Sequence, residues 1–200
     1  HLWYRRQRQM CIRDSLYIAQ YRTYGIKKLE YANAKVDSSW GVNGTAHKGN
    51  CQTYYPYSIE SASGVVYAIS WSNRRIVKIR ESDGACLGFI NLGGYPYNMT
   101  IDSGKIFVGG TFGYKVYDIN SGQLRNCGGV NSQLRYSYAT TIDAGNIFSY
   151  RSNRIYKFPL NQSGMCPSSS GQSFYYPEGA YVSLKNIGAN EIWTLSWSYS

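Results

Sequence analysis

VVYAIS, at residues 65–70, is a short apolar phrase that recurs as KIFVGG at 105–110, NIFSYR at 146–151 and EIWTLS at 191–196. The first residues of successive phrases lie 40, 41 and 45 positions apart. A period of this size is the signature of a repeat architecture, in which one structural unit recurs along the chain. The phrases are rich in β-branched and aromatic residues, which favour half-buried strands. The sequence therefore predicts an all-β chain of similar units.

Each unit arranges the same parts around this phrase. Before the phrase come an aromatic lead-in, a short strand-like run and a turn that ends in glycine, and after it comes a third strand-like run. The lead-ins are Tyr55-Pro56-Tyr57, Tyr95-Pro96-Tyr97 and Tyr136-Ser137-Tyr138, the turns are Ser63-Gly64, Ser103-Gly104 and Ala144-Gly145, and the third runs lie at 74–80, 114–120 and 153–159. Runs bounded in this way are typical of strands joined by hairpins. No segment carries a sustained apolar stripe at helical spacing, so we expect little helix.

Four strands per unit, at a period of about 40 residues, match one blade of a β-propeller. We expect three complete four-stranded blades flanked by two partial ones, in units at about 16–54, 55–94, 95–135, 136–175 and 176–200. The first unit carries an insertion, which we place at 37–50 because that stretch is rich in Gly, Asn and Ser. Propellers typically have about 4–8 blades. We therefore expect residues 16–200 to form a partial β-propeller, cut short at both ends of the chain.

The repeated phrases resemble the blades of the NHL and YVTN propellers. In those families a phrase of the form Asp-x-x-Gly-x-Ile-Tyr-Val leads into Arg-Ile-x-Lys-Phe. Asp102-Ser103-Gly104-Lys105-Ile106-Phe107-Val108 is similar to the first half, and RIYKF at 154–158 and RIVKI at 75–79 are similar to the second. The Gly-His and Trp-Asp signatures of WD40 blades are absent from the sequence. The resemblance implies an NHL-like propeller over residues 16–200.

Residues 1–15, HLWYRRQRQMCIRDS, show no strand period and no signal-peptide pattern. The string RRQRQMCIRDS resembles a translated sequencing adapter, and we interpret the segment as a non-native or disordered leader. The alternative is a basic arm for nucleic acid. Residues 1–15 contribute +3 of the formal net charge of +10. The remaining basic residues are scattered, so we expect no nucleic-acid partner.

The composition favours an extracellular or cell-surface protein. Charged residues make up 16% of the chain, against about 25% in an average soluble domain. Tyrosine is unusually common, with 21 residues among 200. No segment approaches the ~20 apolar residues that a membrane-spanning helix needs.

Four cysteines outside the leader recur at intervals close to the repeat period. We place each of them at the start of the fourth strand of its unit: Cys51, Cys86, Cys127 and Cys166. Equivalent points on the outer strands of adjacent blades should lie beyond the ~7 Å Cα limit for a disulfide. We therefore expect no bridge within the chain. The alternatives are four small buried hydrophobes or cysteines that bond between chains or to missing blades, and the sequence leaves their redox state open.

The sequence carries little catalytic chemistry. His47 is the sole histidine outside the leader, and no Gly-x-Ser-x-Gly elbow accompanies it. Acidic residues do recur at the end of the first strand of three units: Glu60, Asp102 and Asp143. In a propeller this strand lines the central channel, so such carboxylates could hold a cation. The competing interpretation is a turn role, since Asp before a Gly turn bonds its own backbone. We predict no catalytic residues, no metal and no cofactor.

The aromatic lead-ins are the best candidates for a binding surface. We select Tyr57, Tyr95, Tyr97 and Tyr138, because tyrosine combines a large apolar body with a polar tip. The alternative role is packing between blades, and the two roles are compatible. The favoured function is a non-catalytic scaffold that recognises a protein or glycan and is open to self-association. The alternatives are a propeller-type hydrolase, lactonase or lyase with a channel metal, and a structural component of a surface assembly.

Overall fold

The computed structural model describes residues 15–20, 25–30, 32–46, 51–125, 134–161, 166–168, 171–175, 181–186 and 192–197. The predicted leader lies outside this range except for Ser15, as do His47 and Cys127. The described residues form sixteen strands and no α-helix. Accordingly, no helix within these ranges has the length and apolar character that a membrane span requires.

The strands form five antiparallel sheets, of which three have four strands and two have two strands within the described residues. The first four-stranded sheet contains β3(Ile59–Ala62), β4(Val65–Ser70), β5(Arg75–Arg80) and β6(Cys86–Asn91). The second contains β7(Pro96–Asp102), β8(Lys105–Gly110), β9(Gly113–Asp118) and β10(Leu124–Arg125). The third contains β11(Ala139–Asp143), β12(Asn146–Arg151), β13(Arg154–Pro159) and β14(Gln172–Tyr175). The two-stranded sheets pair β1(Ser15–Gln20) with β2(Gly25–Glu30) and β15(Tyr181–Asn186) with β16(Ile192–Trp197). Three full blades and two partial ones are the predicted arrangement, which is confirmed.

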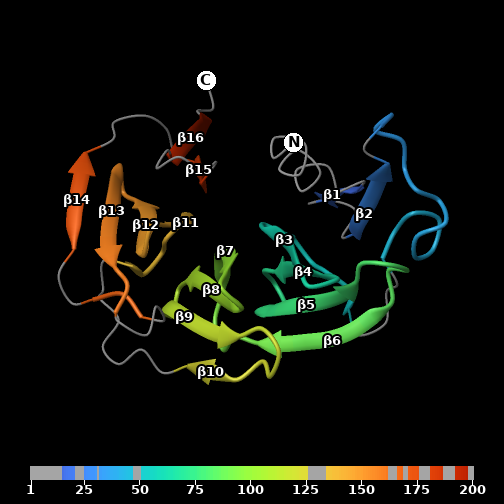
Figure 1. Cartoon of the computed structure of the whole chain (residues 1–200), viewed down its shortest axis with the longest axis horizontal. Coiled ribbons are helices and arrows are strands. Elements are labelled where there is room, and N and C mark those ends of the chain that lie inside the picture. The colour runs from blue at the N-terminus through green and yellow to red at the C-terminus, as the bar shows by residue number, and fades with distance from the viewer. Residues whose placement is uncertain are drawn as a thin grey trace, which may run out of the picture.

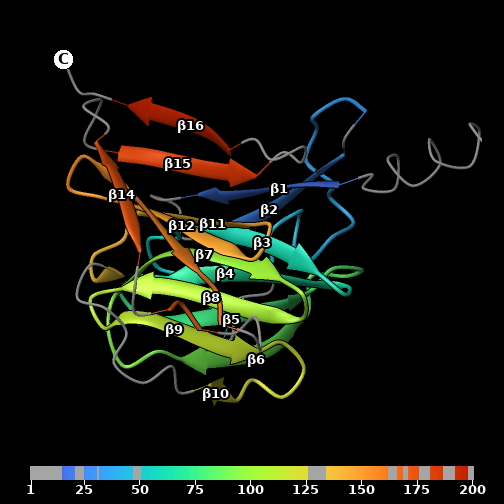
Figure 2. The same cartoon turned by 60° about the vertical axis from the view of Figure 1, so that its left-hand side comes forward.

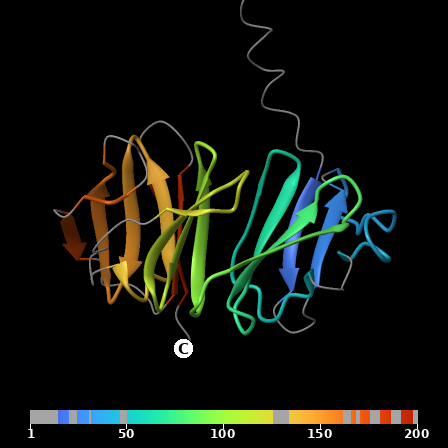
Figure 3. The same cartoon turned by 90° about the horizontal axis from the view of Figure 1, so that it is seen from below.

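The sheets radiate from a common centre, as Figure 1 shows. Strands β3, β7, β11 and β15 lie innermost, and β6, β10 and β14 lie at the rim. Neighbouring inner strands contact one another from β3 to β7, β7 to β11 and β11 to β15. Turned by 60°, the molecule shows its sheets stacked face against face (Figure 2). Seen from below, the strands of the blades stand side by side and run in roughly the same direction (Figure 3). This is the geometry of a partial β-propeller.

The core lies between the blades, which explains why the repeated phrase is apolar throughout. Successive side chains of a strand point to opposite faces of its sheet. In β4, Val66 and Ala68 belong to the cluster shared with the first sheet, whereas Tyr67 and Ile69 belong to the cluster shared with the third. A strand buried on both faces reads as a continuous hydrophobic run rather than an alternating one.

The first hairpin turn of each complete blade requires a left-handed backbone. Ser63, Ser103 and Ala144 have φ values of 51°, 47° and 44°, and the glycines that follow have φ values of 75°, 72° and 72°. Positive φ at both central residues is the pattern of a type I′ turn, whose twist matches that of the flanking strands. The small-residue-plus-glycine pairs in the sequence are explained by this requirement.

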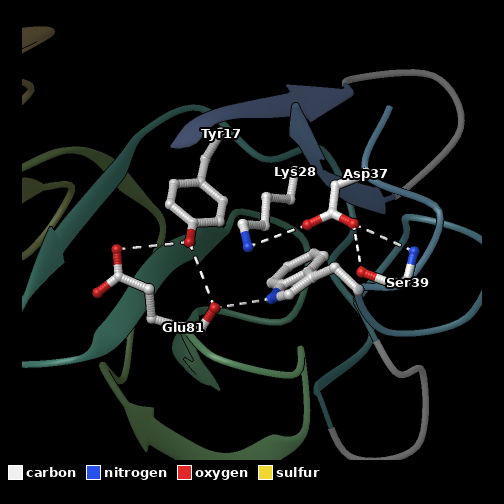
Figure 4. Close-up of polar contacts among 6 residues, drawn as sticks. Tyr17, Lys28, Asp37, Ser39 and Glu81 are labelled. Carbon is white, nitrogen blue, oxygen red and sulfur yellow. Dashed lines mark hydrogen bonds and ion pairs between the residues drawn. The ribbon is translucent and has the colours of Figure 1, made fainter. Parts of the chain in front are cut away.

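The loop after β2 replaces the outer part of the first blade and docks on the second. Residues Val36 and Thr45 form isolated bridges to β2, and the buried Trp40 donates from Nε1 to the backbone oxygen of Glu81 at 3.0 Å. Figure 4 shows this contact beside Tyr17, whose hydroxyl reaches the same residue. An ion pair of 3.0 Å between Lys28 and Asp37 holds the start of the loop (Figure 4).

The expectation of no disulfide within the chain is wrong. Cys51 and Cys86 are bonded, with a Cα–Cα distance of 5.4 Å, and Cys166 is also disulfide-bonded. Cys86 does begin a fourth strand, β6, but Cys51 lies in the loop that crosses from β2 to the second blade. Its sulfur lies 3.2 Å from the backbone oxygen of Lys78 and 3.4 Å from that of Gly88. The two cysteines are therefore not equivalent in the repeat, so the predicted separation between outer strands does not apply.

Candidate binding surface

The aromatic lead-ins lie at one end of the blades, beside the loops that join the second and third strands. Hairpin pairing places these segments together, since Ser70 pairs with Arg75 and Arg151 with Arg154 at the same end. We call the surface they form the aromatic face; it comprises residues 54–58, 71–74, 95–97, 111–112, 135–138 and 151–154.

Backbone hydrogen bonds hold each lead-in against its own blade. Trp71 donates its amide to the oxygen of Tyr55 at 3.4 Å, and Thr111 donates to that of Tyr95 at 2.9 Å. In the next blade the amide of Tyr138 donates to the oxygen of Tyr150 at 3.1 Å. Tyr55 also has a φ of 51°, a left-handed conformation that is uncommon in a residue with a side chain. The lead-ins are thus held in fixed positions from which their rings can project.

The first group of rings on this face is built around Trp71. Its ring centroid lies 4.6 Å from that of Tyr95, 6.1 Å from that of Tyr57 and 6.4 Å from that of Tyr55. These distances are typical of favourable aromatic pairs. Trp71 therefore joins the lead-in of the second blade to that of the third.

The second group joins the third blade to the fourth. The rings of Tyr97 and Tyr138 lie 5.2 Å apart. Burial raises the pKa of Tyr97, and the neighbouring hydroxyls of Tyr138 and Tyr136 add to this effect. A proton on the Tyr97 hydroxyl is therefore retained at physiological pH, so the group acts as a neutral donor and acceptor.

The four predicted tyrosines differ in exposure. Tyr57 is 47% exposed and Tyr138 is 41% exposed, whereas Tyr95 and Tyr97 are partly buried. In each group one ring is presented to solvent and its neighbour supports it. The structure therefore shows these rings packed between blades, with Tyr57 and Tyr138 exposed, and their role in binding stays a prediction.

Sequence reasoning missed the residues that connect these tyrosines. Trp71 and Arg74 lie in the loop between β4 and β5, which the repeat pattern marked only as a connection. The guanidinium carbon of Arg74 lies 4.4 Å from the centroid of the Tyr95 ring, and its Nη2 donates to the Tyr95 hydroxyl at 2.8 Å. Hairpin geometry is a signal that could have found them, because it places this loop beside the lead-ins.

The candidate metal ligands do not gather in the described part of the chain. Across those residues, no three His, Cys, Asp or Glu side chains lie close enough to hold one metal ion. In the β-ladders Asp102 lies opposite Lys105, and Asp143 lies opposite Asn146. A pocket of about 390 Å³ lies away from the aromatic face and is lined by Asn146, Lys157, Pro159, Gly171 and Gln172.

No protein-family model matches the chain, and no curated protein matches it by sequence. Solved structures do match. The computationally designed Ika8 protein is 10% identical, with a TM-score of 0.62 over 91% of this chain and 52% of that one. Hydrazine synthase from Kuenenia stuttgartiensis is 11% identical, with a TM-score of 0.62 over 84% of this chain and 48% of that one.

At such low identity these likenesses establish the fold alone. This chain spans about half the length of each of these two structures. Together with the three four-stranded sheets, the matches show that the described residues form a partial β-propeller.

Proposed function

We propose that this chain is a non-catalytic propeller scaffold that recognises a protein or glycan ligand through its aromatic face. The observation that supports this proposal most strongly is the pair of exposed rings, Tyr57 and Tyr138, each supported by a neighbouring aromatic ring. Exposed, pre-positioned tyrosines supply contact area at a low cost in conformational entropy. A rigid scaffold that presents binding residues on loops is a common arrangement for recognition.

We also propose that the protein works outside the cell or at its surface. We propose further that its blades are of the NHL-like type. The disulfide between Cys51 and Cys86 supports an oxidising compartment. The recurring phrases RIVKI at 75–79 and RIYKF at 154–158 support the NHL-like assignment.

The test is a binding screen on immobilised glycans and secreted proteins, followed by truncation of the exposed rings. Tyr57→Ala and Tyr138→Ala should each weaken binding of a captured ligand by roughly tenfold or more while leaving the melting temperature nearly unchanged. Tyr175→Ala is the matched control, since Tyr175 is 68% exposed but lies on the outer strand β14. Equal binding by all three variants to every captured ligand would refute the proposed surface.

A further inference from the structure

Carboxylates are unevenly divided between the two ends of the blades. Within residues 54–58, 71–74, 95–97, 111–112, 135–138 and 151–154, which make up the aromatic face, there is no Asp or Glu. The same segments hold four arginines: Arg74, Arg135, Arg151 and Arg154. Five carboxylates of the complete blades lie at the opposite turns, at Glu81, Asp83, Asp102, Asp118 and Asp143, and Glu60 lies within β3. A ligand that contacts these segments therefore meets arginine side chains and no carboxylate that belongs to the segments.

The arginines on this face are positioned by the same rings. Arg74 is exposed and lies over Tyr95, and Arg135 and Arg151 each place their guanidinium carbon 5.8 Å from the centroid of Tyr136. In the described residues neither Arg74 nor Arg135 forms an ion pair. The two ion pairs found there, Lys28–Asp37 and Arg80–Asp83, belong to the first blade and to a turn at the opposite end.

Tyrosine rings beside guanidinium groups suit a ligand that contains both ring structures and anionic groups. The planar fork of arginine matches carboxylate and sulfate oxygens in a bidentate manner. Exposed tyrosine rings offer apolar surface to the C–H faces of a sugar and a hydroxyl to its polar groups. Single-stranded nucleic acid also suits such a surface. The disulfides favour the sugar, because they persist in oxidising compartments outside the cytosol.

We propose that the aromatic face binds an acidic polysaccharide, whose anionic groups contact Arg74 and Arg135 while its sugar rings lie against Tyr57 and Tyr138. This inference rests on the proposed function and gives its ligand a chemical class. Sulfate and carboxylate share the chemistry that the arginines recognise, and the experiment separates these two sources.

The experiment measures binding of the full chain to dextran, dextran sulfate, polygalacturonate and poly(dT). Dextran and dextran sulfate share a backbone, so their difference isolates the anionic group. The chain should bind at least one acidic polysaccharide roughly tenfold more tightly than dextran, with affinity falling as salt is raised. Binding of dextran sulfate alone or of polygalacturonate alone would identify the preferred anion, and either result supports the proposal.

Variants of arginine locate the contact. Arg74→Gln should weaken binding of the acidic polysaccharide by roughly tenfold, and Arg74→Lys should weaken it less, since lysine keeps the charge and loses the fork. Arg80→Gln is the matched control, because the Arg80 side chain is 51% exposed and lies at the opposite end. Melting temperatures of the three variants check that each one folds.

Three outcomes would overturn the proposal. The first is equal affinity for dextran and both acidic polysaccharides, which would leave the proposed glycan scaffold in place without the preference for charge. The second is tighter binding of poly(dT) than of any polysaccharide. The third is an equal effect of Arg74→Gln and Arg80→Gln, which would indicate non-specific attraction to the net charge of +10.

Discussion

Gly145, in the turn between β11 and β12, isolates the effect of one backbone conformation. Its φ is 72°, and a Cβ atom added there would meet no heavy atom within 4 Å. A change at this position therefore reports the left-handed conformation without steric conflict with neighbours. Gly64 occupies the equivalent position in the second blade, two blades earlier in the chain, with a φ of 75° and the same open space.

We predict that Gly145→Ala lowers the free energy of unfolding by about 1–2 kcal/mol, which is the cost of a left-handed L-residue. Gly64→Ala should cost a similar amount, whereas Gly145→Asn should cost less because Asn tolerates this region. Urea unfolding of the purified chain measures all three. A stability of Gly145→Ala equal to that of the unchanged chain would contradict the type I′ assignment.

At this scale the sequence predicts turns better than it predicts contacts. The pairs Ser63-Gly64 and Ala144-Gly145 mark their turns because the requirement for positive φ is local. Trp71 and Arg74 gave no such signal, since their partner Tyr95 is 24 and 21 positions away in the chain and belongs to the next blade. A contact of this kind depends on how blades pack, which one unit of the repeat does not encode.

Among the elements, the strands were predictable and the loop after β2 was not. The apolar phrases predict β4, β8 and β12 because each of these strands is the second in its sheet and packs between neighbouring blades. The loop has no repeat to follow, and it crosses to the second blade through Trp40 and Cys51. The disulfide between Cys51 of this loop and Cys86 therefore links two blades whose strands are not hydrogen-bonded to each other.

We predict that removing this bond, as Cys51→Ala with Cys86→Ala, lowers the free energy of unfolding by about 2–4 kcal/mol, mainly by freeing the unfolded chain across 35 residues. Chemical unfolding measures the loss of stability. Because the variant has no Cys51–Cys86 bond left to reduce, a reductant should cause no further loss at this site. Cys166 is left unchanged, because its own disulfide would otherwise confuse the comparison. A stability equal to that of the unchanged chain would show that the bond does not hold the loop to the blade.

On the scale of the whole molecule, the faces of the first sheet differ sharply. Tyr17 and Ala19 of β1 pack against the cluster shared with the second sheet. Leu16 and Ile18 alternate with them and point the other way, where they are 49% and 41% exposed. In β4, by contrast, both faces are buried. Among the described elements, none covers this face of β1 enough to bury Leu16 and Ile18.

We predict that the 200-residue chain self-associates through this face, because apolar side chains on a flat strand attract a second sheet. Leu16→Lys with Ile18→Lys should shift the chain toward the monomer in size-exclusion chromatography with light scattering. Leu124→Lys is the matched control, since Leu124 is 51% exposed on the outer strand β10. A chain that stays monomeric at high concentration, with a cooperative melt, would show that the exposed face is stable in water without a partner.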